Sequence, residues 1–295
     1  MAPIGQAEAV ERQVADGGSP TQLGRAAVAY AATRSILTPA SGFLVRYRYT
    51  LNPYGGCAFG CTYCYARSFA PTVAKQEAWG KWVTVKENAA ALVADACRSG
   101  KLETGDAVYM SSVTDPYQPI ERQLELTRSV LQVLLDHGVQ PRLTVQTRSP
   151  LVTRDIDLFR RFERVRVNIT IGTDSDEVRR RYEPHCPSIG RRFEAAAALA
   201  AAGIRLGVSV SPMLPLVDVE AFGARLASLK AAYATQYLKP PRGRYRFVAG
   251  SDPEALRLAR EDGWGHAEYE RARERLTEIL QPRALWEGAN GYGPG

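Results

Sequence analysis

The chain has 295 residues, 45% of them hydrophobic, which is enough to build one large α/β domain with a full core. Its formal net charge of +7 and pI near 9.2 are compatible with an anionic partner such as nucleic acid, although the arginines are spread along the chain. Residues 1–30 lack the apolar core of a signal peptide, and the longest apolar run, residues 195–204, is too short to span a membrane. We therefore expect a cytoplasmic protein without a membrane segment.

The N-terminal part, residues 1–40, is expected to be a partly disordered extension. Within it, an Ala-rich stretch at residues 25–33 is compatible with a helix. Residues 43–51, FLVRYRYTL, alternate between apolar and polar side chains, which predicts a strand. This strand leads directly into a cysteine-rich loop, so we expect the loop at the carboxyl end of the strand.

Helices and strands alternate in the segment that follows the loop. Apolar residues at helical spacing predict helices over residues 86–98, 119–137, 154–164 and 188–202. Short apolar or alternating stretches predict strands over residues 107–111, 142–147, 165–171 and 204–211. A sixth strand is expected near Gln236 or Tyr245.

Strands separated by helices of this length are typical of parallel βα units. The count of about six predicts an α/β fold, an open partial TIM barrel of the (β/α)6 type, over residues 41–240. Residues 241–295 are predicted to be a helical appendage, with helices over residues 253–261 and 267–280 after a loop at residues 239–246. Its Gly-rich end, residues 288–295, is expected to fray.

Three of the five cysteines, Cys57, Cys61 and Cys64, lie within eight residues. Soft thiolate ligands select zinc, copper(I) or iron–sulfur clusters. A structural zinc site usually has four protein ligands, whereas three thiolates on a four-iron cluster leave one iron open to another ligand. The spacing C-x3-C-x2-C therefore favours a cluster that takes part in chemistry. The alternative is a zinc site completed by one of three further residues: Cys97, His185 or Cys186.

This cysteine spacing, with the aromatic Tyr63 directly before the last cysteine, resembles that of the radical S-adenosylmethionine (SAM) superfamily. The surrounding sequences NPYGGC and CYAR, the later TDPYQPIE and the EP-x-x-P…R run are similar to the spore photoproduct lyase-like branch. The similarity extends from about residue 49 to residue 218, more than half of the chain. It implies the same partial barrel that the strand count predicts.

The resemblance implies an enzyme of lyase or oxidoreductase type. In the family, the three cysteines hold a 4Fe–4S cluster whose open iron binds the amino and carboxylate groups of SAM. The reduced cluster cleaves SAM to a 5′-deoxyadenosyl radical, which abstracts hydrogen from a substrate that this sequence does not identify. Such an enzyme needs an electron donor of the flavodoxin or ferredoxin type, and we expect it to be a monomer.

The resemblance also implies contacts to SAM around the first two strands. Tyr63 corresponds to a family residue that lies near adenine. The loop SSVTDPYQ contains Ser112, Thr114 and Asp115, each of which can accept a hydrogen bond from the SAM ammonium group. Asp115 is equally consistent with a turn in which the aspartate caps the backbone and Pro116 fixes the chain direction.

Further candidate SAM ligands follow the later strands. Arg148 lies where the relatives place a cation towards the SAM carboxylate, and arginine suits this contact through its two-pronged geometry. Thr170 occupies the position that contacts the SAM ribose, whereas Arg192 can pair with Glu183 or with SAM. Three residues near the end of the fifth strand are placed to line the adenine side: Ser209, Ser211 and Met213.

Two residues bear on the reaction itself. Tyr65, which follows the last cluster cysteine, is the candidate catalytic residue, because a tyrosine near a radical can relay hydrogen; stacking is the alternative role. In spore photoproduct lyases a cysteine three residues before the loop aspartate returns hydrogen to the repaired thymine. Ser112 stands at that position here, and its O–H bond is too strong for this donation.

Three functions follow from these patterns. The preferred one is a radical SAM enzyme with an unidentified substrate. The second is a DNA-lesion repair lyase of the spore photoproduct type, favoured by the basic charge and opposed by Ser112. The third is a zinc-binding, nucleic-acid-binding module without catalysis, which the thiols and the positive charge also permit.

Overall fold

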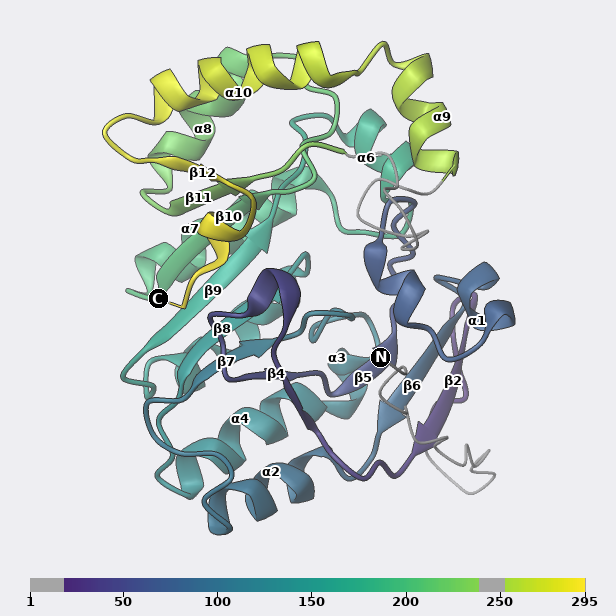
Figure 1. Ribbon diagram of the computed structural model, residues 1–295, viewed down its shortest axis with the longest axis vertical. Coiled ribbons are helices and arrows are strands. Elements are labelled where there is room, and N and C mark those ends of the chain that lie inside the picture. Colours follow the sequence, from purple (N-terminus) through teal and green to yellow (C-terminus); the bar gives the residue numbers. More distant parts are fainter. Residues whose placement is uncertain (1–18, 239–252, 295) are drawn as a thin grey trace.

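A computed structural model describes residues 19–238 and 253–294 of the chain (Figure 1). Its larger sheet has eight strands in the order β12, β11, β10, β9, β8, β7, β4, β3. These strands are Leu37–Pro39 (β3), Tyr49–Leu51 (β4), Ala107–Met110 (β7), Arg142–Thr147 (β8), Val165–Thr170 (β9), Arg205–Val210 (β10), Ala232–Thr235 (β11) and Leu285–Glu287 (β12). All neighbours pair in parallel except β3 and β4.

This sheet confirms the prediction of an open partial TIM barrel. The expected sixth strand is β11, which ends directly before Gln236, whereas Tyr245 lies outside the described residues. Strand β12 adds a further parallel strand from the C-terminal part of the chain, where only helices were predicted.

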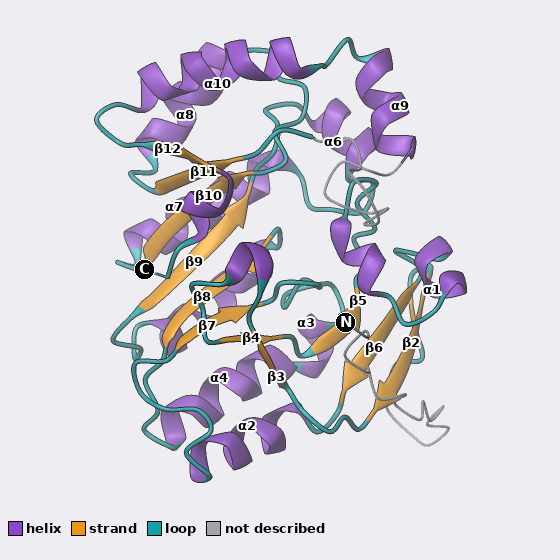
Figure 2. Ribbon diagram, viewed as in Figure 1, coloured by secondary structure: helices purple, strands orange, loops and turns teal. Residues whose placement is uncertain are grey.

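Ten helices are described: Val73–Glu77 (α1), Ala89–Arg98 (α2), Glu121–Leu124 (α3), Leu126–Asp136 (α4), Ile156–Phe159 (α5), Asp176–Tyr182 (α6), Ile189–Ala201 (α7), Val219–Ser228 (α8), Pro253–Glu261 (α9) and His266–Leu280 (α10). Helix α2 packs beside α4, and α8 packs beside α10 (Figure 2). The expected helices over residues 253–261 and 267–280 are confirmed by α9 and α10. No helix in the described ranges is long and apolar enough to cross a membrane.

The barrel strands alternate between an apolar face and a polar face. Four fully buried valines belong to the main core: Val108, Val145, Val167 and Val208. Four side chains at intervening positions are polar: Tyr109, Gln146, Asn168 and Ser209. Because side chains alternate along a strand, the two sets lie on opposite faces of the sheet. The sheet therefore supports a core on one face and places hydrogen-bonding groups on the other.

A smaller sheet corrects the expectation of a helix at residues 25–33. It has the order β1, β2, β6, β5, with strands Gln22–Leu23 (β1), Ala26–Ala31 (β2), Tyr54–Gly56 (β5) and Trp82–Lys86 (β6). In β2, Ala26, Val28 and Tyr30 are buried while Ala27 is exposed, which is the two-residue period of a strand. Strand β6 was not predicted; its residues were in part assigned to the helix that begins only at Ala89.

Two other predicted elements are interrupted. The helix over residues 119–137 divides into α3 and α4, because Glu125 adopts a left-handed conformation with φ of 48°. The helix over residues 154–164 is replaced by the 3₁₀ helix Pro150–Asp155 and the short α5. Both predictions were wrong about continuity, because apolar spacing alone does not show where the backbone turns.

The segment before β4 contacts the C-terminal segment of the chain. The strand predicted over residues 43–51 begins only at Tyr49 and is preceded by the 3₁₀ helix Gly42–Leu44. The C-terminal residues that were expected to fray instead form the 3₁₀ helix Gly288–Tyr292, in which Tyr292 is buried. The rings of Phe43 and Tyr292 lie 5.2 Å apart, and the Tyr292 hydroxyl contacts Ser209 on β10. The division into residues 1–40, 41–240 and 241–295 stays a prediction, and residues 1–18 and 239–252 lie outside the described ranges.

Candidate functional site

The three clustered cysteines lie in the loop that follows β4 and β5. Backbone bonds from Gly60 N to the Cys57 carbonyl, 3.3 Å, and from Cys64 N to the Cys61 carbonyl, 3.2 Å, fold the loop into consecutive turns. All three cysteines are free; Cys57 and Cys61 are buried, and Cys64 is half-buried. The loop therefore presents three thiols from one short, tightly turned stretch.

Glycines allow this loop to lie close to the smaller sheet. Gly56 has φ of 66°, and a Cβ there would lie 2.6 Å from both the ring and the carbonyl oxygen of Trp82. Gly60 has φ of 55°, and a Cβ there would lie 2.9 Å from the Cα of Gly80. Only glycine combines the left-handed backbone with such close approach. The path of the backbone through the cysteine loop is thus restricted at these two glycines.

The thiols have different electrostatic surroundings. Burial, with the nearby Asp115 carboxyl and the other two thiols, raises the pKa of Cys57, and burial beside Cys61 raises the pKa of Cys64 to about 11. The pKa of Cys61 is instead lowered, chiefly by a hydrogen bond with Cys186, whose sulfur lies 3.6 Å away. The contact with Cys186 thus distinguishes the surroundings of Cys61 from those of the other two thiols.

The donor set fits an iron–sulfur cluster with three protein ligands. It consists of three free thiols in one loop, and thiolates are the ligands that such clusters use. Within the described ranges, no group of three or more His, Cys, Asp or Glu side chains is arranged to hold a single metal ion. Of the proposed fourth zinc ligands, Cys186 contacts Cys61, whereas Cys97 lies on α2 and packs against the main core.

A buried ionic cluster lies beside the cysteine loop and contains three of the predicted residues. The Tyr63 hydroxyl donates to Glu183, and the guanidinium of Arg192 lies 2.5 Å from the same carboxylate. Arg148 approaches Glu183 to 3.3 Å through Nε and donates to the Tyr63 oxygen at 3.2 Å. Burial would raise the pKa of Glu183, but Arg192 and Arg148 outweigh it and lower this pKa to about 2. Glu183 is thus a carboxylate that compensates two cations.

The two arginines of this cluster differ in accessibility. The side chain of Arg192 is fully buried, and it also donates to the carbonyls of Pro187 at 3.0 Å and Thr170 at 3.2 Å. The side chain of Arg148 keeps 20% of its surface exposed. Of the two, Arg148 is the cation that a ligand at the surface of the site can reach.

The candidates in the loop after β7 are all engaged in internal hydrogen bonds. Asp115 accepts from Tyr117 N at 2.9 Å and from the Thr147 hydroxyl at 2.7 Å, which agrees with the turn-capping alternative. Thr114 donates to the Gly56 carbonyl at 2.5 Å. The backbone N–H of Ser112 donates to Asn52 at 2.9 Å. The loop is thus fixed to both the cysteine loop and the end of β8.

The remaining candidates line the barrel or its rim. Thr170 accepts from Gln146 at 2.6 Å on the polar face of the sheet, and Met213 is fully buried. Tyr65 keeps 39% of its surface exposed, and its hydroxyl donates to the carbonyl of Ser112. The structure therefore brings Tyr65 next to the position that the resemblance assigns to a hydrogen donor.

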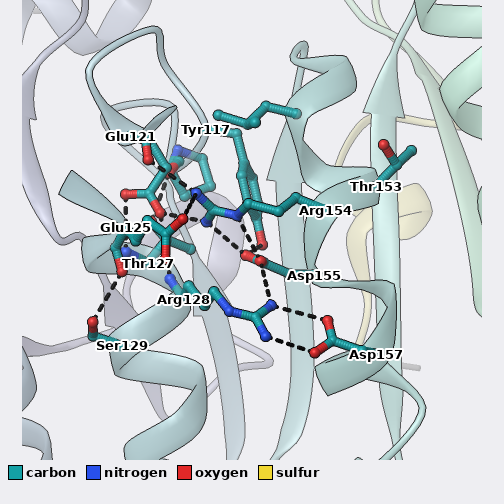
Figure 3. Close-up of polar contacts among 12 residues, drawn as sticks. Tyr117, Glu121, Glu125, Thr127, Arg128, Ser129, Thr153, Arg154, Asp155 and Asp157 are labelled. Carbon is teal, nitrogen blue, oxygen red and sulfur yellow. Dashed lines mark hydrogen bonds and ion pairs between the residues drawn. The ribbon is translucent and has the colours of Figure 1, made fainter. Parts of the chain in front are cut away.

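A second polar network is centred on Glu121, Arg154 and Asp155 (Figure 3). The buried Glu121 accepts from Thr127 N at 3.0 Å and from Arg154 at 2.7 Å, and it also receives the hydroxyl of Tyr54 on β5. The buried Asp155 pairs with the same Arg154 at 2.7 Å. This network joins β5, the start of α4 and the 3₁₀ helix after β8. It therefore links the strand before the cysteine loop to the segments that follow the loops after β7 and β8.

Sequence reasoning missed two residues that organise the site. Asn52 receives N–H groups from Ser112 and Val113 at 2.9 and 3.2 Å, and Gln118 accepts from Ala58 N at 3.0 Å within the cysteine loop. Both lie within the sequences NPYGGC and TDPYQPIE, which were noted only as similar to the family. The signal was present in these sequences, but it did not show which residues join the two loops.

Comparison with known proteins gives a family and a set of relatives. The family model of the radical SAM superfamily matches residues 51–225. An uncharacterized protein of Methanocaldococcus jannaschii is 38% identical over 174 residues, which cover 59% of this chain and 63% of that protein. An uncharacterized protein of Mycobacterium tuberculosis is 32% identical over 202 residues, which cover 64% of this chain and 57% of that protein. The chain thus spans about three fifths of these relatives.

Solved structures share the fold. Spore photoproduct lyase complexed with dinucleoside spore photoproduct is 17% identical, with a TM-score of 0.60, covering 88% of this chain and 81% of that one. A mutant of that lyase with bound AdoMet and dinucleoside spore photoproduct is 16% identical, with a TM-score of 0.57, covering 92% and 86%. At these identities the likeness concerns the architecture of the barrel.

Proposed function

The chain belongs to the radical SAM superfamily, and from this we propose that it is a radical SAM enzyme whose 4Fe–4S cluster is held by Cys57, Cys61 and Cys64. The observation that carries the proposal is the placement of three free thiols in one loop beside a partly exposed arginine, Arg148. Bound there, such a cluster supplies the electron that cleaves SAM reductively and so starts hydrogen abstraction from a substrate. The chain itself supplies ligands, orientation and exclusion of water.

We assign Arg148 to the carboxylate of SAM. Its guanidinium lies over the Tyr63 ring, 5.8 Å from the centroid, and a hydrogen bond from its Nε to Glu183 orients it. A planar, two-pronged donor suits a carboxylate ligand. Arg192 is proposed to act through Glu183 and not on SAM directly, because its guanidinium is buried against that residue.

Other groups are proposed to complete the SAM contacts. Tyr63 lies beside adenine, Thr170 faces the ribose, and Ser112 with Thr114 lies near the ammonium group. Asp115 orients the start of the loop after β8 by accepting a hydrogen bond from the backbone N–H of Arg148. Tyr65 is the proposed hydrogen relay, since its exposed ring lies at the rim of the site directly after Cys64. The reductant is proposed to be a flavodoxin- or ferredoxin-type protein acting on a cytoplasmic monomer.

The direct test is anaerobic iron–sulfur reconstitution, followed by reduction with dithionite in the presence of SAM. We expect a brown protein that contains four irons and releases 5′-deoxyadenosine. Cys61→Ala should lose both the cluster and SAM cleavage, whereas Cys97→Ala, which alters a thiol on α2, should keep both. A colourless protein that retains one zinc and no iron would contradict the proposal and favour the zinc-binding module.

A DNA-lesion lyase is the second candidate. It is supported by the fold shared with spore photoproduct lyase and by the net charge of +7. Ser112 opposes it, because a serine stands at the position of the hydrogen-donating cysteine. A lyase of this kind should bind DNA with an affinity that falls steeply as salt increases, and it should convert spore photoproduct to two thymines. An enzyme for a peptide or small molecule should do neither.

A further inference from the structure

Cys186 is a fourth thiol beside the cysteine loop, although it lies outside the C-x3-C-x2-C spacing. Its sulfur lies 3.6 Å from that of Cys61, and the two residues are 125 positions apart in the sequence. Both side chains are buried, with 6% and 5% of their surfaces exposed. A proposed cluster ligand is therefore in direct contact with a thiol that the cluster does not need.

Hydrogen bonds to the backbone on both sides of the pair hold this contact in place. Thr62, next to Cys61, donates its N–H and its hydroxyl to the Tyr182 carbonyl, at 2.9 and 3.2 Å. The N–H of Cys186 donates to the Glu183 carbonyl at 3.1 Å, and its own carbonyl accepts from Arg179 at 3.2 Å. The contact is thus built by the segment after α6 and does not depend on a freely moving side chain.

The remaining distance is small for a covalent bond. A disulfide has its sulfurs about 2.05 Å apart, so the pair needs to close by about 1.5 Å. Rotation about the two Cα–Cβ bonds can supply part of this movement, and the anchored backbones keep the two sulfurs close together while it occurs. The buried position favours a small oxidant such as a peroxide.

We propose that Cys61 and Cys186 form a reversible disulfide when no cluster is bound, with a peroxide as the oxidant. The Cys61 sulfur attacks hydrogen peroxide, giving a sulfenic acid and one water. The Cys186 sulfur then attacks this sulfenic acid, forming the S–S bond and releasing a second water. In total, two thiols lose two electrons and two protons, and the peroxide is reduced to two waters.

The disulfide acts as a redox-sensitive lock on cluster assembly. This consequence rests on the proposed role of Cys61 as a cluster ligand, whereas the formation of the bond does not. While the bond exists, Cys61 is not available to iron. The bond also stops Cys61 from proceeding to the sulfinic and sulfonic acids, which are not readily reversed. A dithiol reductant returns both thiols and makes the loop competent again.

The test is a thiol map of the metal-free, 295-residue chain. The protein is treated with one equivalent of hydrogen peroxide, blocked with N-ethylmaleimide, digested with chymotrypsin without reduction and analysed by mass spectrometry. Cleavage after Phe59 and Tyr63 separates Cys61 from the two neighbouring cysteines. We expect the Cys61 peptide linked to the Cys186 peptide, and we expect free thiols to fall from five to three and to recover with dithiothreitol.

Variants and alternative products decide the outcome. The linked peptide should be absent in Cys186→Ser and present in Cys97→Ser, the matched replacement of a thiol outside the site. If Cys186→Ser fails to fold, the fall in the number of free thiols in the wild-type protein decides the outcome. A bond confined to Cys57, Cys61 and Cys64, or a fully alkylated Cys186 beside an oxidised Cys61, would overturn the proposal.

Iron uptake separates this proposal from the proposed function. Oxidised wild-type protein should bind iron only after dithiothreitol, while protein kept reduced should bind it directly. If no sample binds iron and the linked peptide still forms, the proposed cluster-binding enzyme function fails and the disulfide stands. If reduced protein binds the cluster and no linked peptide forms, the disulfide fails and the enzyme assignment stands.

Discussion

The carboxylate of Asp115 accepts a hydrogen bond from the backbone N–H of Arg148, with 2.8 Å between oxygen and nitrogen. Through this bond the loop after β7 fixes the start of the loop after β8. The side chain of Arg148 then points towards Tyr63 and Glu183, beside the cysteine loop. The direction of the proposed SAM-binding cation is thus set by a residue whose carboxylate accepts three hydrogen bonds within the chain.

Asp115→Asn should weaken both the fold and SAM binding. The carboxylate is buried and accepts three hydrogen bonds, whereas an amide keeps one acceptor oxygen and turns its NH2 donor towards at least one group that is itself a donor. We expect a loss of about 1–3 kcal/mol in the free energy of unfolding, measured in urea. Asp157→Asn is the control, because that carboxylate is 57% exposed and its pair with Arg128 should contribute about 1 kcal/mol or less. Equal stability of the two variants would contradict this account.

Arg148→Lys should lower the affinity for SAM while leaving the cluster in place. Lysine keeps the charge but has no two-pronged donor, and it loses the stacking of the guanidinium on Tyr63. We expect the Kd to rise about tenfold, which corresponds to about 1.4 kcal/mol. Titration calorimetry on the reconstituted protein measures this, with iron content as the check on cluster binding.

The same replacement away from the site gives the control for that experiment. Arg128 forms ion pairs with Asp155 and Asp157, at 2.9 and 2.6 Å, and makes no hydrogen bond or ion pair with the proposed SAM ligands in the described part of the chain. Arg128→Lys should therefore leave the SAM affinity unchanged. If both variants weaken SAM binding equally, the effect comes from general destabilisation and the assignment of Arg148 to the carboxylate is wrong.

The lowered pKa of Glu183 predicts that the free energy of unfolding decreases at acid pH. Its pKa is about 2 in the folded protein, below the ordinary value of 4.5, because Arg192 and Arg148 outweigh the effect of burial. Between these two values the unfolded chain binds the proton more readily, so stability rises with pH. The contribution is complete above pH 4.5 and is lost as the pH falls towards 2.

The comparison of wild type with Glu183→Gln isolates this contribution. At neutral pH the variant should lose about 3–5 kcal/mol, because the buried Arg192 is left without its carboxylate. As the pH falls from 4.5 towards 2, the difference between the two proteins should shrink. Urea unfolding at a series of pH values provides the measurement. A difference that stays constant over this range would show that Glu183 does not carry a depressed pKa.

The sequence was informative where one local pattern determines the outcome. The cysteine spacing indicated the family, and the family match confirms it. Alternating helices and strands indicated a parallel partial barrel, because each βα unit has its own period and stop signals. Even the pairing of Glu183 with Arg192 was among the stated alternatives, and the structure shows this ion pair.

The rest depended on contacts between distant segments. Residues 25–33 are rich in alanine, which favours helices in isolation, yet pairing with β6 makes them a strand. Glycines at the C-terminus suggested fraying, but Tyr292 packs against Phe43, about 250 positions earlier in the chain. Cys186 shows the same limit within the site. The sequence marked it only as one of three alternative fourth ligands of a zinc site, and only the folded chain places its sulfur beside Cys61.

Gly56→Ala should reduce iron incorporation by crowding the cysteine loop. Gly56 and Gly138 have nearly equal φ, 66° and 67°, so alanine at either position carries a similar backbone cost of about 1–2 kcal/mol. The two positions differ in the room available for a side chain. A Cβ at Gly56 would lie 2.6 Å from Trp82, whereas a Cβ at Gly138 would have no neighbour within 4 Å. Gly138→Ala therefore measures the backbone cost alone. We expect Gly56→Ala to unfold at a clearly lower urea concentration than Gly138→Ala. After reconstitution, Gly56→Ala should bind less iron, while Gly138→Ala should bind as much iron as the wild type. If the two variants bind equal iron, the close packing of the loop on Trp82 does not determine the geometry of the thiols.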